Sequence, residues 1–189
     1  MGRKSILDER AVFAAAGAEI ACKGVVTLQG LSSATGASIG SLYHRFGSRE
    51  ALLAEAWLDA VRLFQSGFLG ALKRASSIGA GERAALETPR FCRAEPDAAI
   101  VLACCRQAEF LGAETPNPMV KDIAAVNDEV DDEMRRFARR VGRPLLNCRL
   151  ALVAYPLAAV RIYLPDTPVP TSIDREVLKA YRAAMSREG

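Results

Sequence analysis

The stretch TLQGLSSATGASIGSLYHRFGSREALL, residues 27–53, decides the fold of this chain. Thr27 is a good N-cap for a short helix, and Gly36 supplies the turn that ends it. Ser38 caps a second short helix, which ends near Arg45. Two short helices joined by a tight glycine turn are the minimum description of a helix-turn-helix.

The outward face of the second short helix has the chemistry of a surface that reads DNA. At about 100° per residue, Ile39, Gly40, Tyr43 and His44 cluster on one side of this helix, and Leu42 points the opposite way. The clustered side is small, polar and aromatic, and Gly40 leaves no side chain in the way. A helix that lies in a major groove needs such a face.

The same run resembles the N-terminal domain of TetR-family regulators, over roughly the first third of the chain. The family pattern is a Thr that opens the first short helix, a Gly turn, Ser-x-Gly-[Thr/Ser]-Leu-Tyr-x-x-Phe, and then Ser-[Lys/Arg]-Glu-x-Leu. So many matches at fixed spacing are a specific signal. The matching positions are Thr27, Gly36, Ser38, Gly40, Ser41, Leu42, Tyr43, Phe46, Ser48, Arg49, Glu50 and Leu52.

Two residues depart from the family pattern. Glu19 stands where the family tends to place an apolar residue. Gly30 lies inside the first short helix, where glycine costs about 1 kcal/mol relative to alanine. Both departures concern the packing of the first two helices rather than the DNA-reading helix.

The resemblance also implies roles for individual residues in DNA binding. Phosphate contacts are implied for Thr27, Tyr43, His44 and Arg49. An approach to base edges is implied for Ser38, Ile39 and Gly40. Physical chemistry agrees for Arg49, because the free N–H groups and positive dipole end of a helix N-terminus favour a phosphate. Tyr43 as a core tyrosine and His44 as an exposed residue without a role stay open as alternatives.

The rest of the chain is predicted to be helical as well, because period-two strand patterns are absent and Ala and Leu dominate. A helix from about Asp8 to Cys22 precedes the quoted stretch, and a long helix begins after Ser48. The expected fold class is therefore all-α, with a three-helix helix-turn-helix domain at residues 1–47. A helical ligand-binding and dimerisation domain follows at residues 48–189, and the helix from 48 is shared between the two.

In the second domain, prolines mark the predicted starts of several helices. Residues 76–89 contain glycine and serine, have a weak pattern and are expected to form a loop. Later helices are predicted to start near Pro96, Pro118 and Pro144. The helix that starts near Pro118 carries acidic residues ahead of basic ones, which predicts a solvated face. Its expected i, i+4 pairs are Asp131–Arg135 and Asp132–Arg136. A last helix carries Ile173, Val177, Tyr181 and Met185 on one stripe.

Composition excludes several classes of protein. The net charge of +3 is mildly basic and does not by itself indicate a nucleic-acid binder. The first residues carry charges where a signal peptide needs an apolar run, and the longest apolar stretch, Leu150–Val160, is too short for a bilayer. We therefore expect a cytoplasmic protein without a membrane partner. Five scattered cysteines and one histidine predict neither a disulfide framework nor a zinc site, so no metal or cofactor is expected.

The resemblance implies a homodimer built by the last two long helices. Small residues that allow close helix approach are Ala151, Ala154, Ala158 and Ala159. Apolar area comes from Leu145, Leu152, Val160 and Ile162. Two-fold symmetry then predicts a palindromic operator in double-stranded DNA.

The expected function is a transcriptional regulator, in particular a repressor that a small, mainly hydrophobic effector releases from its operator. The candidate residues for the ligand cavity are Phe64, Phe68, Phe91, Cys105, Phe110, Met119 and Tyr155. A solid core built from the same side chains is the alternative. Two other functions stay open: regulation through oxidation of Cys104 and Cys105, and a helical thiol enzyme. No catalysis is expected, because no base other than His44 accompanies the thiols.

Overall fold

Helices are the regular elements of residues 7–106 and 117–186, which the computed structural model of the chain describes. In chain order they are α1 (Glu9–Lys23), α2 (Leu28–Thr35), α3 (Ile39–Phe46), α4 (Arg49–Arg74), α5 (Ile78–Ala85), α6 (Glu87–Ala94), α7 (Pro96–Cys104), α8 (Asn117–Ala125), α9 (Asp128–Val141), α10 (Leu145–Arg149), the π-helix η2 (Leu150–Ala154), α11 (Tyr155–Val160) and α12 (Ile173–Met185).

Capping residues set the boundaries of the first helices, and the sequence predicts two of these N-caps, Thr27 and Ser38. The side chains of Asp8, Thr27 and Ser38 each accept a hydrogen bond from the backbone N–H three residues later. Gly24 and Gly36 end α1 and α2 with φ of 68° and 72°, a left-handed conformation that favours glycine. The predicted helix-turn-helix is therefore confirmed at the level of its elements.

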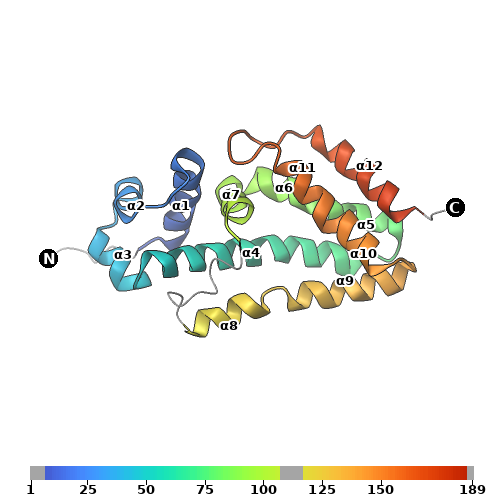
Figure 1. The fold of residues 1–189 in the computed structure, drawn as a ribbon, viewed down its shortest axis with the longest axis horizontal. Coiled ribbons are helices and arrows are strands. Elements are labelled where there is room, and N and C mark those ends of the chain that lie inside the picture. The colour runs from blue at the N-terminus through green and yellow to red at the C-terminus, as the bar shows by residue number, and fades with distance from the viewer. Residues whose placement is uncertain (1–6, 107–116, 187–189) are drawn as a thin grey trace.

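The long helix α4 runs the length of the molecule, with α1–α3 at one end and the remaining helices along the rest (Figure 1). Its first half packs into a core with α1–α3 and α7, in which Leu52 and Trp57 are buried. Its second half packs into a second core with α9 and α12, around Phe68, Phe137 and Tyr181. The two cores therefore share one rigid element.

Residues 76–89 form helices rather than the expected loop. Ser77 caps α5, and α6 carries Pro89 in its first turn, where no backbone N–H is needed. The apolar pattern of α5 is weak because its buried residues are small. A Cβ at Gly81 would stand 2.8 Å from Phe137 Cζ and 3.2 Å from Tyr181 Cζ, so close approach replaces large side chains.

The expected continuous helix after Pro118 is broken into α8 and α9. The break is fixed by Gln65 of α4, which is only 9% exposed. Its Nε2 donates to the carbonyl of Val126 at 2.9 Å and to Asn127 Oδ1 at 3.1 Å. A carbonyl that a helix break releases thus finds its partner on another helix.

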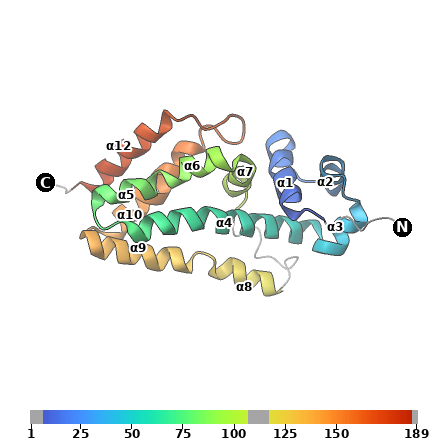
Figure 2. The same cartoon turned by 180° about the vertical axis from the view of Figure 1, so that it is seen from behind.

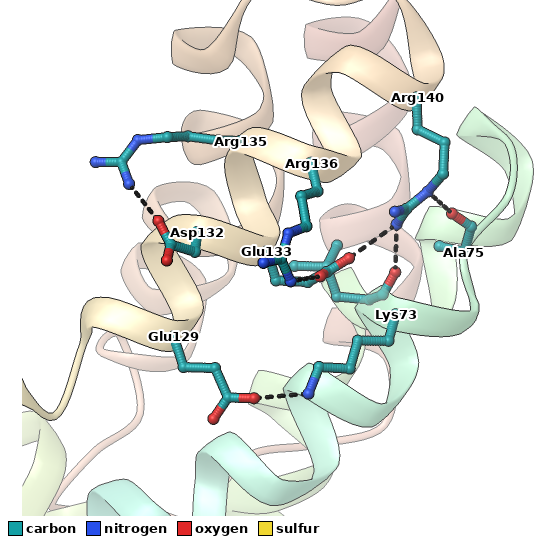
Figure 3. Close-up of polar contacts among 9 residues, drawn as sticks. Lys73, Ala75, Glu129, Asp132, Glu133, Arg135, Arg136 and Arg140 are labelled. Atoms are coloured by element: carbon teal, nitrogen blue, oxygen red, sulfur yellow. Dashed lines mark hydrogen bonds and ion pairs between the residues drawn. The ribbon is translucent and has the colours of Figure 1, made fainter.

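Ion pairs and hydrogen bonds join the end of α4 to α9, as Figure 3 shows. Arg140 donates to the carbonyls of Leu72 and Ala75, each at 3.0 Å, and to Glu133 Oε1 at 3.1 Å. Lys73 pairs with Glu129 at 2.6 Å. The last carbonyls of α4 are therefore satisfied by a side chain from a distant part of the sequence.

These contacts correct the prediction that α9 has a wholly solvated face with i, i+4 pairs. Glu133 has a side chain only 5% exposed and lies between Arg136 and Arg140. Asp132 pairs with Arg135 at i+3, and Asp131 pairs with Arg149 of α10. The carboxylates pair differently because α4 and α10 bring other groups within reach.

The helix that starts after Pro144 contains a wide turn. The backbone N–H of Tyr155 bonds to the carbonyl of Leu150, five residues earlier, and Pro156 follows directly. Proline lacks an N–H and its ring crowds the preceding turn, so the π-turn lets the helix continue through it. Over the two described ranges of the chain, no helix is long and apolar enough to cross a membrane.

The last helix agrees with the prediction. Ile173, Val177, Tyr181 and Met185 are all buried on one face of α12. Tyr181 Oη donates to the carbonyl of Ile78 at 2.6 Å, which ties α12 to α5.

Candidate functional site

The helix α3 presents an exposed face at the end of the molecule away from the second core. Leu42 and Phe46 are buried and anchor α3 in the first core. Gly40, Tyr43 and His44 are exposed, and Tyr43 keeps 52% of its surface. Tyr43 is therefore not a core residue, and the face has the small and aromatic character that the sequence suggests.

Ser38 and Ile39 lie where α3 begins. Ser38 is exposed, and its Oγ accepts from Ser41 N at 3.0 Å as the N-cap of the helix. Ile39 is half-buried, so part of its side chain supports the fold and part stays accessible. The structure thus brings Ser38, Ile39, Gly40, Tyr43 and His44 to one short helix.

Thr27 lies at the N-terminus of α2, where Glu19 uses its hydrogen-bond donors. Glu19 Oε2 accepts from Thr27 N at 2.8 Å and from Thr27 Oγ1 at 3.2 Å. Lys23 Nζ stands 2.6 Å from Glu19 Oε1. The hydrogen bond from Lys23 and the bonds from Thr27 lower the pKa of the Glu19 carboxyl, which stays ionised. A carboxylate of the chain itself therefore occupies the donors that a phosphate would use at this position.

Gly30 makes room for that carboxylate. A Cβ at position 30 would stand 2.5 Å from Glu19 Oε2, and nearer still to Oε1 and Cδ. The two departures from the family pattern thus form one unit, in which Glu19 takes the space that a side chain at Gly30 would need. Glu19 is 7% exposed, and an acidic residue facing a helix-interior glycine is the signal that the sequence carries for it.

Arg49 opens α4 but is partly engaged by the fold. Its Nε donates to the carbonyl of Val26 at 2.5 Å, and its Nη1 stands 3.1 Å from Glu50 Oε1. The side chain is 36% exposed, so one edge of the guanidinium remains accessible. Arg49 therefore holds the α1–α2 connection as well as facing solvent.

Sequence reasoning missed the part that Arg45 plays on α3. Arg45 pairs with Glu9 of α1 and with Glu55 of α4, and its guanidinium lies 4.7 Å from the centre of the Phe46 ring. The hydrogen bond from Arg45 lowers the pKa of Glu9. Ion pairs with these two carboxylates thus hold Arg45, and with it α3, against α1 and α4.

A separate apolar pocket of about 170 Å³ lies between α4, α6, α7 and the helix pair η2–α11. Its walls are lined by Phe64, Thr88, Phe91, Cys92, Ala99, Leu102, Ala103, Val153, Leu157, Val160 and Leu164. Among the described residues that line it, only Thr88 and Cys92 have a polar side-chain atom. Burial raises the pKa of the Cys92 thiol to about 11, so it stays uncharged at neutral pH.

The structure brings Phe64 and Phe91 together in this pocket, with ring centres 5.5 Å apart in an edge-to-face arrangement. Phe68, one turn further along α4, is buried in the second core, and its ring lies against that of Phe64. Tyr155 is 40% exposed on the surface.

The other three residues expected in the cavity lie elsewhere. Cys105 and Met119 pack against the first core instead. Phe110 lies outside the described residues. Neighbours in space, set by helix crossings, decide which side chains reach the pocket.

Cys104 and groups of metal-binding side chains are the other candidates for a functional site. Cys104 is exposed and not in the core, and partial burial raises its pKa. In the part of the chain that the structure describes, no three His, Cys, Asp or Glu side chains gather in a way that could hold a metal ion.

Residues 12–56 match the family model described as bacterial regulatory proteins, tetR family. The N-terminal domain is that of the TetR family. The match confirms the resemblance of residues 27–53 to this family. Members of the TetR family are DNA-binding transcriptional regulators and not enzymes, so the thiol-enzyme alternative is set aside.

Solved structures share the fold of the whole chain. A TetR-family transcriptional regulator, PfmR from Thermus thermophilus, is 21% identical with a TM-score of 0.72, over 92% of this chain and 96% of that one. The fatty acid degradation regulator FadR from Bacillus halodurans is 13% identical with a TM-score of 0.71, over 98% of both chains. A TetR-family regulator from Marinobacter aquaeolei is 14% identical with a TM-score of 0.69, over 94% of this chain and 93% of that one.

At these identities the likeness shows the fold, which is the all-α TetR arrangement of an N-terminal helix-turn-helix domain and a C-terminal helical domain. No curated protein matches the chain in sequence. Residues 12–56 thus match a family of bacterial regulatory proteins, and the whole chain has the fold of TetR-family structures.

Proposed function

We propose that this TetR-family protein is a homodimeric repressor, which a small and mainly hydrophobic effector releases from a palindromic operator. Residues 1–47 carry DNA binding, and residues 48–189 carry effector binding and dimerisation, with α4 common to both. The DNA contacts come from the exposed face of α3 and from the helix ends that flank it. The bound effector lies in the apolar pocket between α4, α6, α7 and α11.

The observation that carries the proposal is that α7, which lies beside α1 (Figure 2), also lines the pocket. On one side, Ala99 and Leu102 of α7 line the pocket. On the other, a Cβ at Gly17 of α1 would stand 2.9 Å from the Cα of Asp97 and closer still to its carbonyl group. Helices packed this closely move together, so an effector that displaces α7 displaces α1 with it.

DNA binding is tested at α3 with Gly40→Glu. The nearest atom to a Cβ at Gly40 is Ser38 Oγ at 3.8 Å, so the substitution fits without strain and adds negative charge to the DNA face. We expect it to abolish retardation of an operator duplex, selected from random sequences, while the urea midpoint does not fall below that of the parent. Gln29→Glu, an exposed change on α2, is the charge-matched control and should bind more strongly than Gly40→Glu. Equal binding by Gly40→Glu and the parent would remove α3 from the DNA interface.

The dimer is supported by an exposed apolar stripe on α10, η2 and α11. Leu146 is 65% exposed, Val153 40% and Ile162, just beyond α11, 77%. Ala154 and Ala158 lie exposed between them and allow close approach. From the set expected at the interface, Ala151, Leu152 and Val160 are buried in the chain's own core and are not available to a partner.

A second copy of this chain satisfies that stripe, since an isolated monomer would leave its large side chains in water. Ile162→Glu should then produce a monomer in sedimentation velocity at micromolar concentration and should weaken operator binding. Ala124→Glu, at an exposed alanine of α8, should remain dimeric. A monomeric parent that binds DNA tightly would refute the dimer. In a dimer, the half-sites of the operator are expected about 34–36 Å apart, or a multiple of that distance.

Effector release is tested by filling the pocket. Ala99 is 2% exposed and lines the pocket, so Ala99→Leu should occupy part of its volume. The variant should still bind the operator but lose its response to apolar compounds that release the parent. Linkage also requires that operator DNA weaken effector binding by the same factor. A parent whose DNA binding ignores a broad panel of apolar compounds would overturn this part of the proposal.

Oxidation of Cys104 and Cys105 is less well supported as a signal. Reactive thiols need a lowered pKa, whereas partial burial raises that of Cys104. Operator binding should therefore be insensitive to peroxide at concentrations that oxidise ordinary thiols slowly. Loss of binding that Cys104→Ser prevents would reverse this ranking.

A further inference from the structure

The apolar pocket has a buried inner end and an outer end at the surface of the single chain. Thr88, Cys92, Ala99 and Val160 are buried and form the inner end. Val153 also lines the pocket and is 40% exposed in the single chain, on the surface proposed above to pack against the second copy. None of the described residues at the inner end carries a charge, so this end accepts hydrocarbon or another uncharged group.

A cationic side chain, Arg161, lies next to the lining of this pocket. Arg161 follows directly after Val160 and lies one turn beyond Leu157, both of which line the pocket. Its Nη2 donates to the carbonyl of Ala103, another lining residue, at 3.5 Å. The guanidinium therefore bridges the ends of α11 and α7, at the edge of the apolar walls.

This guanidinium has unused capacity. Among residues 7–106 and 117–186, no carboxylate lies within 4.0 Å of Arg161, whereas other arginines such as Arg93 and Arg182 are paired with acids. Asp166 acts electrostatically on the same Cys104 thiol as Arg161 does, yet it forms no ion pair with Arg161. The bond to the Ala103 carbonyl is long and weak, so the planar donors of Arg161 are available to an anion.

We propose, resting on the effector role of this pocket, that the effector is a small monocarboxylate whose hydrocarbon body fills the pocket and whose carboxylate binds Arg161 at the rim. An isolated cation at the edge of an uncharged cavity selects a molecule with one anionic end and one apolar end. Arginine matches a carboxylate with two parallel N–H donors, which adds orientation as well as affinity. A cationic or doubly charged molecule finds no partner for its charge at the inner end.

The volume sets the size of the apolar body. At about 170 Å³ the pocket is close to an engineered apolar cavity of about 150 Å³ that binds benzene. One aromatic ring, or a chain of five or six carbons on the order of the same volume, therefore fits. The edge-to-face pair of Phe64 and Phe91 provides an aromatic wall for a ring.

The test uses the full chain and isothermal titration with phenylacetate and hexanoate as probes. Their amides, phenylacetamide and hexanamide, keep the body and remove the charge. Binding of the carboxylates should be roughly tenfold tighter than that of the amides, as expected for charge-assisted hydrogen bonds. Arg161→Gln should remove that tenfold preference and leave amide binding unchanged. Arg139→Gln, at an exposed arginine of α9, is the matched control and should keep the preference.

The outcomes separate this inference from the proposed function. If the amides bind as tightly as the carboxylates, or if Arg161→Gln keeps the preference, the carboxylate site is refuted while the pocket can still hold a neutral effector. If neither carboxylate binds, the inference is refuted outright. If the carboxylates bind through Arg161 but leave operator binding unchanged, the site stands and the proposed release mechanism fails.

Discussion

Replacing Gly30 with alanine tests whether Glu19 and Gly30 act as one unit. Alanine inside a helix is about 1 kcal/mol more favourable than glycine, so the substitution alone should stabilise α2. The new Cβ, however, would stand 2.5 Å from Glu19 Oε2 and nearer to the rest of the carboxylate. The flexible Glu19 side chain can swing away, but only by leaving its present partners.

The cost of that movement follows from the bonds to Thr27. Glu19 accepts from Thr27 N at 2.8 Å and from Thr27 Oγ1 at 3.2 Å. A hydrogen bond to a charged group contributes about 1.5–3 kcal/mol, and Thr27 is exposed enough for the lower value to apply. Losing both bonds costs about 3 kcal/mol. After the gain in helix propensity, Gly30→Ala should lower the free energy of unfolding by about 2 kcal/mol.

Urea unfolding followed by circular dichroism at pH 7 and one fixed protein concentration measures this change. Gly40→Ala is the matched control, because the nearest atom to a Cβ there is 3.8 Å away. It should raise the free energy of unfolding by about 0.5–1 kcal/mol. Gly30→Ala made in a Glu19→Ala background should also be stabilising, since the obstructing carboxylate is gone.

The difference between the two backgrounds is the coupling energy, expected at about 3 kcal/mol, the upper end for residues in contact. A Gly30→Ala effect that is the same in both backgrounds would refute the coupling. So would stabilisation by Gly30→Ala in the parent protein.

Three further substitutions test other contacts. Gly17→Ala forces a Cβ to within 2.9 Å of the Asp97 backbone and should destabilise the α1–α7 contact by about 1–3 kcal/mol in urea; a neutral result would mean that the helices separate easily. Arg140→Met removes the donor for the last carbonyls of α4 and should cost about 2–3 kcal/mol, and no loss of stability would show that water replaces it. The lowered pKa of Glu19 contributes stability above its unfolded pKa of about 4.3, and this is lost as pH falls through the lower folded value. Unfolding free energy of the parent should therefore fall more steeply below about pH 4 than that of Glu19→Gln, and equal slopes would contradict the assignment.

The local features of the DNA-binding domain were predictable from the sequence. Thr27 and Ser38 act as N-caps and Gly36 as the turn, because each interaction joins residues no more than four positions apart. Periodicity also separates buried Leu42 from exposed Tyr43 on α3. The same short-range rules placed the buried stripe of α12.

Other features depend on segments far apart in the sequence, and only the tertiary structure decided them. Glu19 facing Gly30 follows from the crossing of α1 and α2, and the break at Asn127 from Gln65, sixty-two positions earlier in the chain. The pocket includes Phe64 but not Phe68, although both are aromatic residues on neighbouring turns of α4. Periodicity tells which face of a helix is apolar, but not which neighbouring helix covers it or where a gap remains. Those answers come from helix crossings, which a single sequence does not encode in any local pattern.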